Sequence, residues 1–292
     1  MPALYTTMAL TNFFKNSPEK AEMSFIDHLE ALRWHIMRSV IALLVGAIVV
    51  FVKMDFFFDS IVMGPAHKDF ITYKVLCNVS HSLGLGAGMC LNDINLKLIS
   101  TEMSSQFMMS FTISLVGGFI LVFPYIFWEF WRFTKPALTP KEQKKTRGVI
   151  FWVSLMFFLG VAFGYYLIAP YTVNFFASYT LSPLIANTFT VSDYVDNIVS
   201  LILGTGVVFQ LPLVVFFLSK IGVLTPAFLR TNRKYAFVII LIIASVITPP
   251  DVISMMIVTI PILALYEISI WISAKAISDM EVKSIDEEKE WS

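Results

Sequence analysis

The chain has 292 residues, of which 57% are hydrophobic and only 14% are charged, and its mean hydropathy is +0.75. Soluble domains average about 45–50% apolar and about 25% charged residues, so this composition excludes a water-soluble globule. The 21 basic and 21 acidic residues cancel. High hydrophobicity and zero net charge also exclude a disordered chain and a nucleic-acid-binding protein.

Six apolar runs are candidates for crossing a membrane. A helix needs roughly 20 mostly apolar residues to span a hydrocarbon core about 30 Å thick. The runs predict an all-α integral membrane protein with six transmembrane helices in a domain over 36–272. In chain order they cover 36–58, 107–130, 149–169, 197–219, 236–247 and 252–272.

The last two runs are separated by Thr-Pro-Pro-Asp at 248–251, where paired prolines cannot continue a helix. The run 236–247 would rise only about 18 Å at 1.5 Å per residue. The apolar run 252–272 is interrupted by Glu267. We therefore expect both of the last helices to be short for the bilayer and to thin it locally or shelter against longer neighbours.

Basic residues favour the cytoplasmic side of a membrane protein, and here they lie mostly on one side. All but four of the 21 Lys and Arg residues fall before, between or after the runs on that side; the exceptions are Lys53, Lys68, Lys74 and Lys97. Both termini are therefore predicted to be cytoplasmic. The segment 1–35 should contain an interfacial helix, and 273–292 should form a charged tail.

The extracytoplasmic loop 59–106 contains both cysteines, Cys77 and Cys90. A bridge between them would close a loop of about 14 residues, worth roughly 3 kcal/mol in the chain-entropy model, and an oxidising compartment would favour it. Two unpaired buried thiols are the alternative. Farther along, Gly160 and Gly164 form a pattern of small residues that lets two helices approach closely.

Polar residues within apolar runs are the candidates for function, because an acid at a helix centre costs about 2.5–3.5 kcal/mol. Glu129, Asp251 and Glu267 lie toward run ends, where this cost is smaller. Gln210 lies deep in the fourth run, where an amide commonly satisfies a polar group of a neighbouring helix. The sequence contains neither a phosphate-binding loop nor a His-Glu-x-x-His motif. We therefore expect no catalytic residues, no metal and no cofactor.

Four segments together resemble the TatC family, the polytopic receptor subunit of the twin-arginine protein translocase. His-Leu-Glu-Ala-Leu-Arg at 28–33 is similar to the family's His-Leu-x-Glu-Leu-Arg. The segment 133–142, Phe-Thr-Lys-Pro-Ala-Leu-Thr-Pro-Lys-Glu, resembles the family's Phe-x-x-Pro-Ala-Leu and downstream Glu. Phe-Gln-Leu-Pro at 209–212 and the turn at 248–251 complete the set in family order.

The resemblance implies a non-enzymatic receptor in the bacterial cytoplasmic (inner) membrane. It would bind the twin-arginine signal peptides of folded cargo at its cytoplasmic face. Its other partners would be single-span TatA/TatB-type subunits, further copies of itself and the lipid bilayer, and translocation would use the proton-motive force. The alternative is a proton-coupled small-solute secondary transporter, with which proline-interrupted helices and Gln210 are compatible, although the sequence shows no inverted repeat.

The resemblance also implies site residues. Glu142, Glu30 and Arg33 would form the signal-peptide site, since carboxylates pair well with guanidinium groups. The family's first glutamate aligns with Ala31, so Glu30 is turned by about 100° on the helix and would have to reach round, unless the helix is rotated or Glu142 dominates. Phe133, Pro136 and Pro65 would shape the loops. Gln210 would help to dock a partner helix within the membrane. The extracytoplasmic turn would be formed by Pro249, Pro250 and Asp251.

Overall fold

The computed structural model describes residues 25–67, 69–82, 97–134, 147–182, 184, 187–248 and 252–291. Nearly all of these residues are helical. In chain order the elements are α2 (Phe25–Val52), α3 (Met54–Phe56), η1 (Phe57–Val62), η2 (Gly64–Ala66), α4 (Ile71–Ser82), β1 (Leu98–Ile99), α5 (Ser105–Thr134), α7 (Arg147–Phe163), η4 (Gly164–Ile168), α8 (Ala169–Ser178), β2 (Phe189–Thr190), α9 (Val191–Val208), α10 (Leu211–Lys220), α11 (Pro226–Thr231), α12 (Arg233–Ile247) and α13 (Val252–Trp291).

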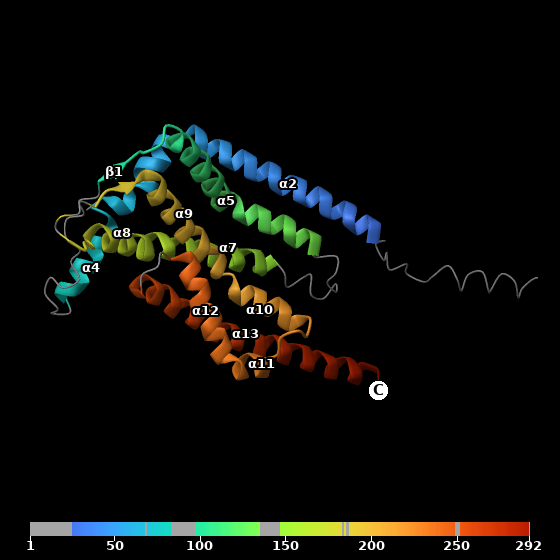
Figure 1. The fold of residues 1–292 in the computed structure, drawn as a ribbon. Helices are drawn as coiled ribbons and strands as arrows, with labels where there is room; N and C mark the ends of the chain where they lie inside the picture. The colour runs from blue at the N-terminus through green and yellow to red at the C-terminus, as the bar shows by residue number, and fades with distance from the viewer. Residues whose placement is uncertain are drawn as a thin grey trace, which may run out of the picture.

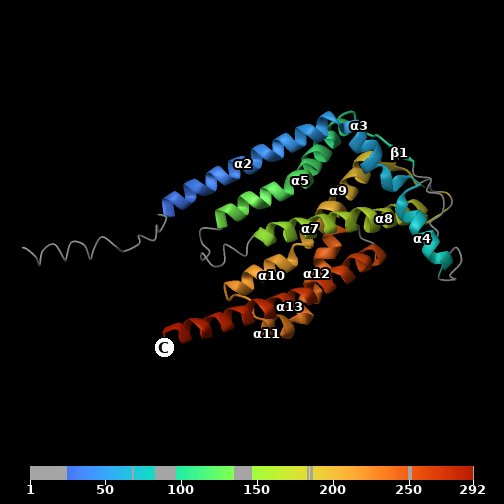
Figure 2. The ribbon, with the colours of Figure 1, turned by 180° about the vertical axis from the view of Figure 1, so that it is seen from behind.

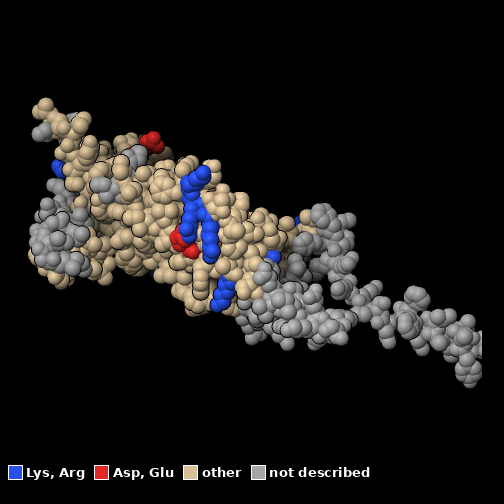
Figure 3. Space-filling model, turned by 90° about the horizontal axis from the view of Figure 1, so that it is seen from below, with Lys and Arg blue, Asp and Glu red and all other residues tan. Residues whose placement is uncertain are grey.

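The long helices are stacked with α2 at one edge and the α11–α13 group at the other (Figures 1 and 2). The start of α2 and the end of α13 lie at the same end of the molecule, while α4 and β1 lie at the opposite end. This arrangement places the ends of the described chain on one side. Apart from one group of basic and acidic side chains, the surface seen from below is mostly uncharged (Figure 3), which suits a protein surrounded by lipid.

Within the described residues, five helical stretches are long and apolar enough to cross a membrane. They are Leu29–Val52, Ser105–Thr134, Gly148–Ser178, Val191–Lys220 and Ser254–Lys275. The multi-pass helical architecture predicted from composition is thus confirmed. Where the fifth span is expected, α12 has 15 residues, a rise of about 22 Å. It is therefore short for a core of about 30 Å, and the count of six spans stays a prediction.

The expectation that the last helix is short is wrong. Helix α13 extends over 40 residues, and its apolar stretch Ser254–Lys275 has 22 residues, which is about 33 Å at 1.5 Å per residue. Glu267 does not end the helix, because Glu is a good helix former and its exposed carboxylate accepts a hydrogen bond from Arg233 Nη2 at 2.8 Å. Only α12 is short.

Helix α2 is continuous from Phe25 to Val52, so the predicted interfacial segment and the first span are one helix. It packs along α5 (Figures 1 and 2). Many apolar side chains on α2 are exposed, including Ile48 at 61% and Val52 at 71%. A helix whose uncovered side is apolar fits contact with lipid.

Buried tyrosines fasten the segment after α2 to the rest of the bundle. The hydroxyl of Tyr73 donates to the carbonyls of Pro65 at 2.7 Å and Pro170 at 3.1 Å, and that of Tyr194 donates to the carbonyl of Val62 at 2.8 Å. Burial raises the pKa of Tyr73, so its hydroxyl stays protonated and keeps donating. Strands β1 and β2 pair in parallel at the same end.

Helix α7 approaches α9 closely at the predicted pair of small residues. A Cβ on Gly160 would lie 2.7 Å from the carbonyl oxygen of Thr205, and one on Gly164 would contact the Thr205 hydroxyl. Gly206 on α9 faces the same contact, where a Cβ would lie 2.9 Å from Val161. The close packing predicted for Gly160 and Gly164 is therefore present.

We expect Gly160→Ala to lower the free energy of unfolding by about 1–3 kcal/mol, the usual cost of overpacking. Gly148→Ala is the matched control in the same helix, since nothing lies within 4 Å of a Cβ there and alanine favours helix formation. Reversible unfolding in mixed detergent micelles measures both. Equal effects of the two variants would contradict the close contact.

Candidate functional site

Two of the predicted signal-peptide residues lie at one end of the α2–α5 pair. Glu30 and Arg33, near the start of α2, are both exposed. Helix α5 ends and α7 begins at this end of the molecule (Figure 1). Glu142 and Pro136 lie between these two helices, outside the described residues. The segment that contains Glu142 and Pro136 therefore begins and ends at this end of the molecule (Figure 1). The positions of the two residues themselves stay predictions.

Phe133 lies in the last turn of α5. Its ring meets the ring of His35 on α2 edge to face, with 6.2 Å between centroids. This contact joins the end of α5 to α2 one turn beyond Ala31. Phe133 thus contributes to the packing of α5 against α2, and its role in the architecture of the loop stays a prediction.

A buried carboxylate, to which sequence reasoning assigned no role, links the same two helices. Glu129 on α5 is 1% exposed and its Oε2 lies 2.5 Å from Nδ1 of His35. Its Oε1 accepts a hydrogen bond from the Tyr125 hydroxyl at 3.1 Å and lies 3.6 Å from Arg132 Nη1. A buried acid is stable only when it is paired. The sequence signal was an acid in an apolar run with a histidine near the start of the preceding run.

The Glu129–His35 contact defines which side of α2 faces α5. Position 31 lies one turn before His35 on the same side, whereas Glu30 is turned about 140° from His35 at 100° per residue. Ala31 is half-buried and Glu30 is exposed. Ala31 therefore lies on the side of α2 that faces α5, and Glu30 lies on an exposed side.

Gln210 lies at the break between α9 and α10, inside the fourth span. Its Nε2 donates to the backbone carbonyl of Val153 on α7 at 3.2 Å, which is the kind of interhelical contact predicted for this amide. Its Oε1 is buried and, among the described residues, accepts no hydrogen bond. Burying an amide oxygen without a hydrogen bond costs about 1–3 kcal/mol.

The turn between α12 and α13, predicted to be extracytoplasmic, is described only at its edges. Pro249, Pro250 and Asp251 lie outside the described residues, between Thr248, which ends α12, and the start of α13. Pro65 is buried in η2, where it occupies the first turn. Its carbonyl accepts a hydrogen bond from the Tyr73 hydroxyl, and its role in loop architecture stays a prediction.

Cys77 lies in α4 and is disulfide-bonded, and Cys90, the chain's other cysteine, lies outside the described residues. We expect non-reducing peptide mapping of protein from its native membrane to yield a linked Cys77–Cys90 fragment. Reduction should separate the two peptides. Recovery of two alkylatable thiols without reduction would contradict the bridge.

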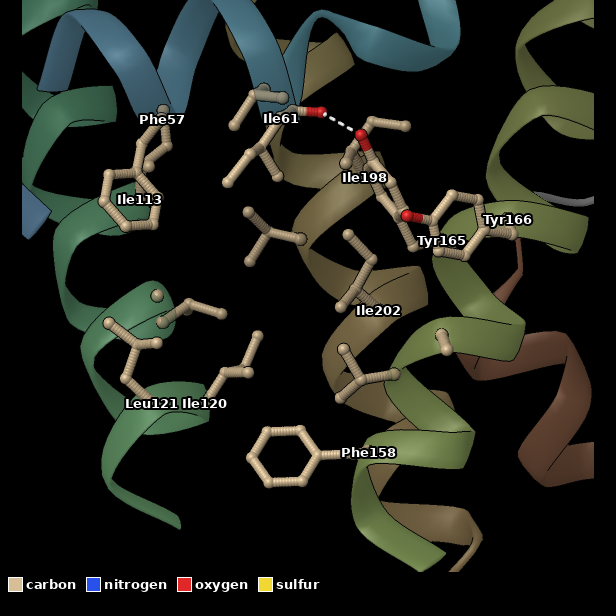
Figure 4. Close-up of a pocket in the computed structure, with 16 residues that line it drawn as sticks. Phe57, Ile61, Ile113, Ile120, Leu121, Phe158, Tyr165, Tyr166, Ile198 and Ile202 are labelled. Carbon is tan, nitrogen blue, oxygen red and sulfur yellow. Dashed lines mark hydrogen bonds between the residues drawn. The ribbon is translucent and has the colours of Figure 1, made fainter. Parts of the chain in front are cut away.

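An apolar cavity of about 350 Å³ lies beside these elements at membrane depth. Figure 4 shows Ile113 and Leu121 of α5 on one side and Ile202 of α9 and Phe158 of α7 across from them. Tyr165 closes one end, where its hydroxyl donates to the carbonyl of Ile61 at 2.9 Å. No charged side chain lines the cavity among the described residues, so it suits an apolar occupant.

Comparison with known proteins places these features in a family. The family model for the Sec-independent protein translocase protein (TatC) matches residues 27–261. The TatC protein of Blattabacterium sp. subsp. Periplaneta americana is 41% identical over 260 residues, covering 87% of this chain and 96% of that protein. The Halalkalibacterium halodurans TatC protein is 32% identical over 252 residues, covering 86% and 89%.

Solved structures agree with the sequence relatives. A crystal structure of the twin-arginine translocase receptor TatC in DDM matches with a TM-score of 0.67 and 30% identity, covering 84% of this chain and 99% of that one. Another crystal structure of the same receptor matches with a TM-score of 0.63 and 29% identity over 86% and 99%. Sequence and fold both show that this chain belongs to the TatC family of Sec-independent protein translocase proteins.

Proposed function

We propose that this chain is the receptor of a twin-arginine export system and binds twin-arginine signal peptides at the α2–α5 end. The observation that carries the proposal is its TatC family membership, together with the exposed Glu30 near the start of α2. Two adjacent guanidinium groups need carboxylates that they can bind in a bidentate manner. Glu142 and Glu30 are the proposed carboxylates, and Arg33 flanks them.

We infer further that the end of the molecule formed by the start of α2 and the end of α5 faces the cytoplasm. The membrane is then the bacterial inner membrane. The start of α2 and the end of α13 share one side of the molecule (Figure 2), and most of the chain's basic residues belong to the segments on that side. The excess of Lys and Arg supports the orientation through the positive-inside tendency.

In this proposal, a single-span TatA/TatB-type subunit docks at the depth of Gln210. The half-buried Gln210 lies at the break in the fourth span, where the partner helix would pack against it, and short α12 would thin the bilayer nearby. Folded cargo would then cross with the proton-motive force, through contacts with these subunits and other copies of the chain. No covalent step or cofactor is needed. Family membership disfavours the small-solute carrier.

The direct test is binding of a signal peptide with two consecutive arginines to the full-length protein in lipid nanodiscs. A matched peptide with two lysines retains the charge but not the bidentate geometry of the guanidinium. Preference for the arginine peptide, with photocross-links from α2, is the expected result. Equal binding of both peptides would overturn the proposal, and uptake of a small solute by vesicles containing the protein would favour the carrier.

A further inference from the structure

Basic side chains gather on the side of the molecule formed by α11, α12 and α13. Arg230, Arg233, Lys234 and Lys275, together called the basic patch, are all exposed. One carboxylate, Glu267, lies among them and accepts a hydrogen bond from Arg233 at 2.8 Å. Within the described part of the chain, the other three form no ion pair. Among these five described side chains the positive charges outnumber the negative by three, and Figure 3 shows basic side chains gathered around an acidic one on this face. Asp279 and Glu281 follow farther along the sequence of α13.

The basic patch lies where the helices leave the apolar part of the bundle. Lys275 is the last residue of the final span, and α12 begins within the patch. The Lys234 ammonium lies 5.0 Å from the centre of the Tyr235 ring, and the Lys275 ammonium lies 5.5 Å from that of Trp271. Exposed aromatic rings beside Lys and Arg mark the headgroup level of a membrane protein.

Apolar surface continues directly from the patch toward the middle of the span. Phe237 and Val238 on α12 are 44% and 52% exposed, and Ile268 on α13 is 48% exposed. Along α13, Glu267, Trp271 and Lys275 recur at four-residue spacing and so share one side of the helix. The site thus has cations at headgroup level and apolar side chains where an acyl chain would run.

We propose that the basic patch binds the headgroup of an anionic phospholipid. A phosphodiester presents oxygens that guanidinium binds with its planar fork and ammonium binds as a point charge. The lipid is already present at this depth, whereas an acidic soluble protein would have to enter the headgroup region. The proposal is independent of the signal-peptide site.

The opposite edge of the molecule has a different charge balance. Near the cytoplasmic ends of α2 and α5, the described basic residues Arg33, Arg38 and Arg132 are accompanied by the acids Glu30 and Glu129. The excess there is one positive charge, against three at the basic patch. A cationic peptide would be repelled by the patch, and an anionic lipid would prefer it.

The experiment uses the full-length protein in phosphatidylcholine vesicles with a trace of spin-labelled lipid. Electron spin resonance measures the fraction of label immobilised by the protein, for phosphatidylglycerol and for phosphatidylcholine. We expect wild type to prefer the anionic label and the triple variant Arg230→Gln, Lys234→Gln, Lys275→Gln to reduce that preference about tenfold, since each basic residue near the surface contributes. The preference should also fall with added salt.

Two further variants keep the result interpretable. Lys53→Gln with Lys74→Gln removes charges from the opposite end of the molecule and should leave the preference unchanged, while Glu267→Gln should raise it. Monodispersity on size-exclusion chromatography checks folding in each case. Equal preference in the triple variant and wild type would overturn the proposal, as would displacement of the label by a soluble acidic peptide but not by unlabelled phosphatidylglycerol.

Discussion

Glu142→Lys should abolish binding of a twin-arginine signal peptide. The substitution replaces the proposed carboxylate with a like charge facing the guanidinium groups, and loss of one partner of a shielded charge pair costs about 2 kcal/mol or more. At about 1.4 kcal/mol per tenfold, the affinity should fall at least about thirtyfold. Fluorescence anisotropy of a labelled peptide, with the full-length protein in nanodiscs, measures the loss.

Glu30→Lys should weaken the same binding less, by roughly two- to fivefold, because Glu30 is exposed and exposed ion pairs are typically worth about 0.2–1 kcal/mol. Glu102→Lys makes the same charge change at an exposed position before α5, at the other end of that helix, and should leave binding unchanged. Photocross-linking to the peptide that is undiminished in both the Glu142 and Glu30 variants would reject these acids as the binding site.

Hydrophobic runs predicted the helical architecture because a bilayer requires long apolar helices whatever their neighbours are. The same reasoning failed at Glu267, where it assumed that a charge ends a span. The charge is tolerated because Arg233, 34 positions away in the sequence, donates a hydrogen bond from Nη2 to Glu267 Oε2 at 2.8 Å. The local sequence around Glu267 does not identify that partner.

Some residues of the candidate site were likewise predicted from the sequence, and one was not. Glu30, Arg33, Phe133 and Gln210 were identified from the resemblance, and the structure places them at the α2–α5 end or within the fourth span. Glu129 was missed because its partner His35 is 94 residues away and periodicity cannot pair two helices. Family motifs indicate which residues to examine, and only packing reveals the contacts that orient them.

Glu129→Leu should destabilise the protein, because Glu129 is 1% exposed and hydrogen-bonded to two side chains. It leaves the imidazole of His35 and the hydroxyl of Tyr125 without their carboxylate partner, and leaving a buried polar group unsatisfied costs about 1–3 kcal/mol. It also releases the contact that orients the start of α2, so peptide binding should weaken although Glu129 is too buried to touch a peptide. Unfolding in mixed micelles and peptide anisotropy measure the two effects.

The double variant His35→Leu with Glu129→Leu tests whether His35 and Glu129 act as a pair, because it removes both partners of the contact at once. Replacing a buried ion pair by apolar residues of similar volume is often neutral or stabilising, so the double variant should unfold later than Glu129→Leu alone. It would restore packing between α2 and α5 without the geometry of the Glu129–His35 contact, so peptide binding should recover only in part. Additive losses of stability in the double variant would show that His35 and Glu129 do not act as a pair, and the orientation of Ala31 and Glu30 on α2 would then need another cause.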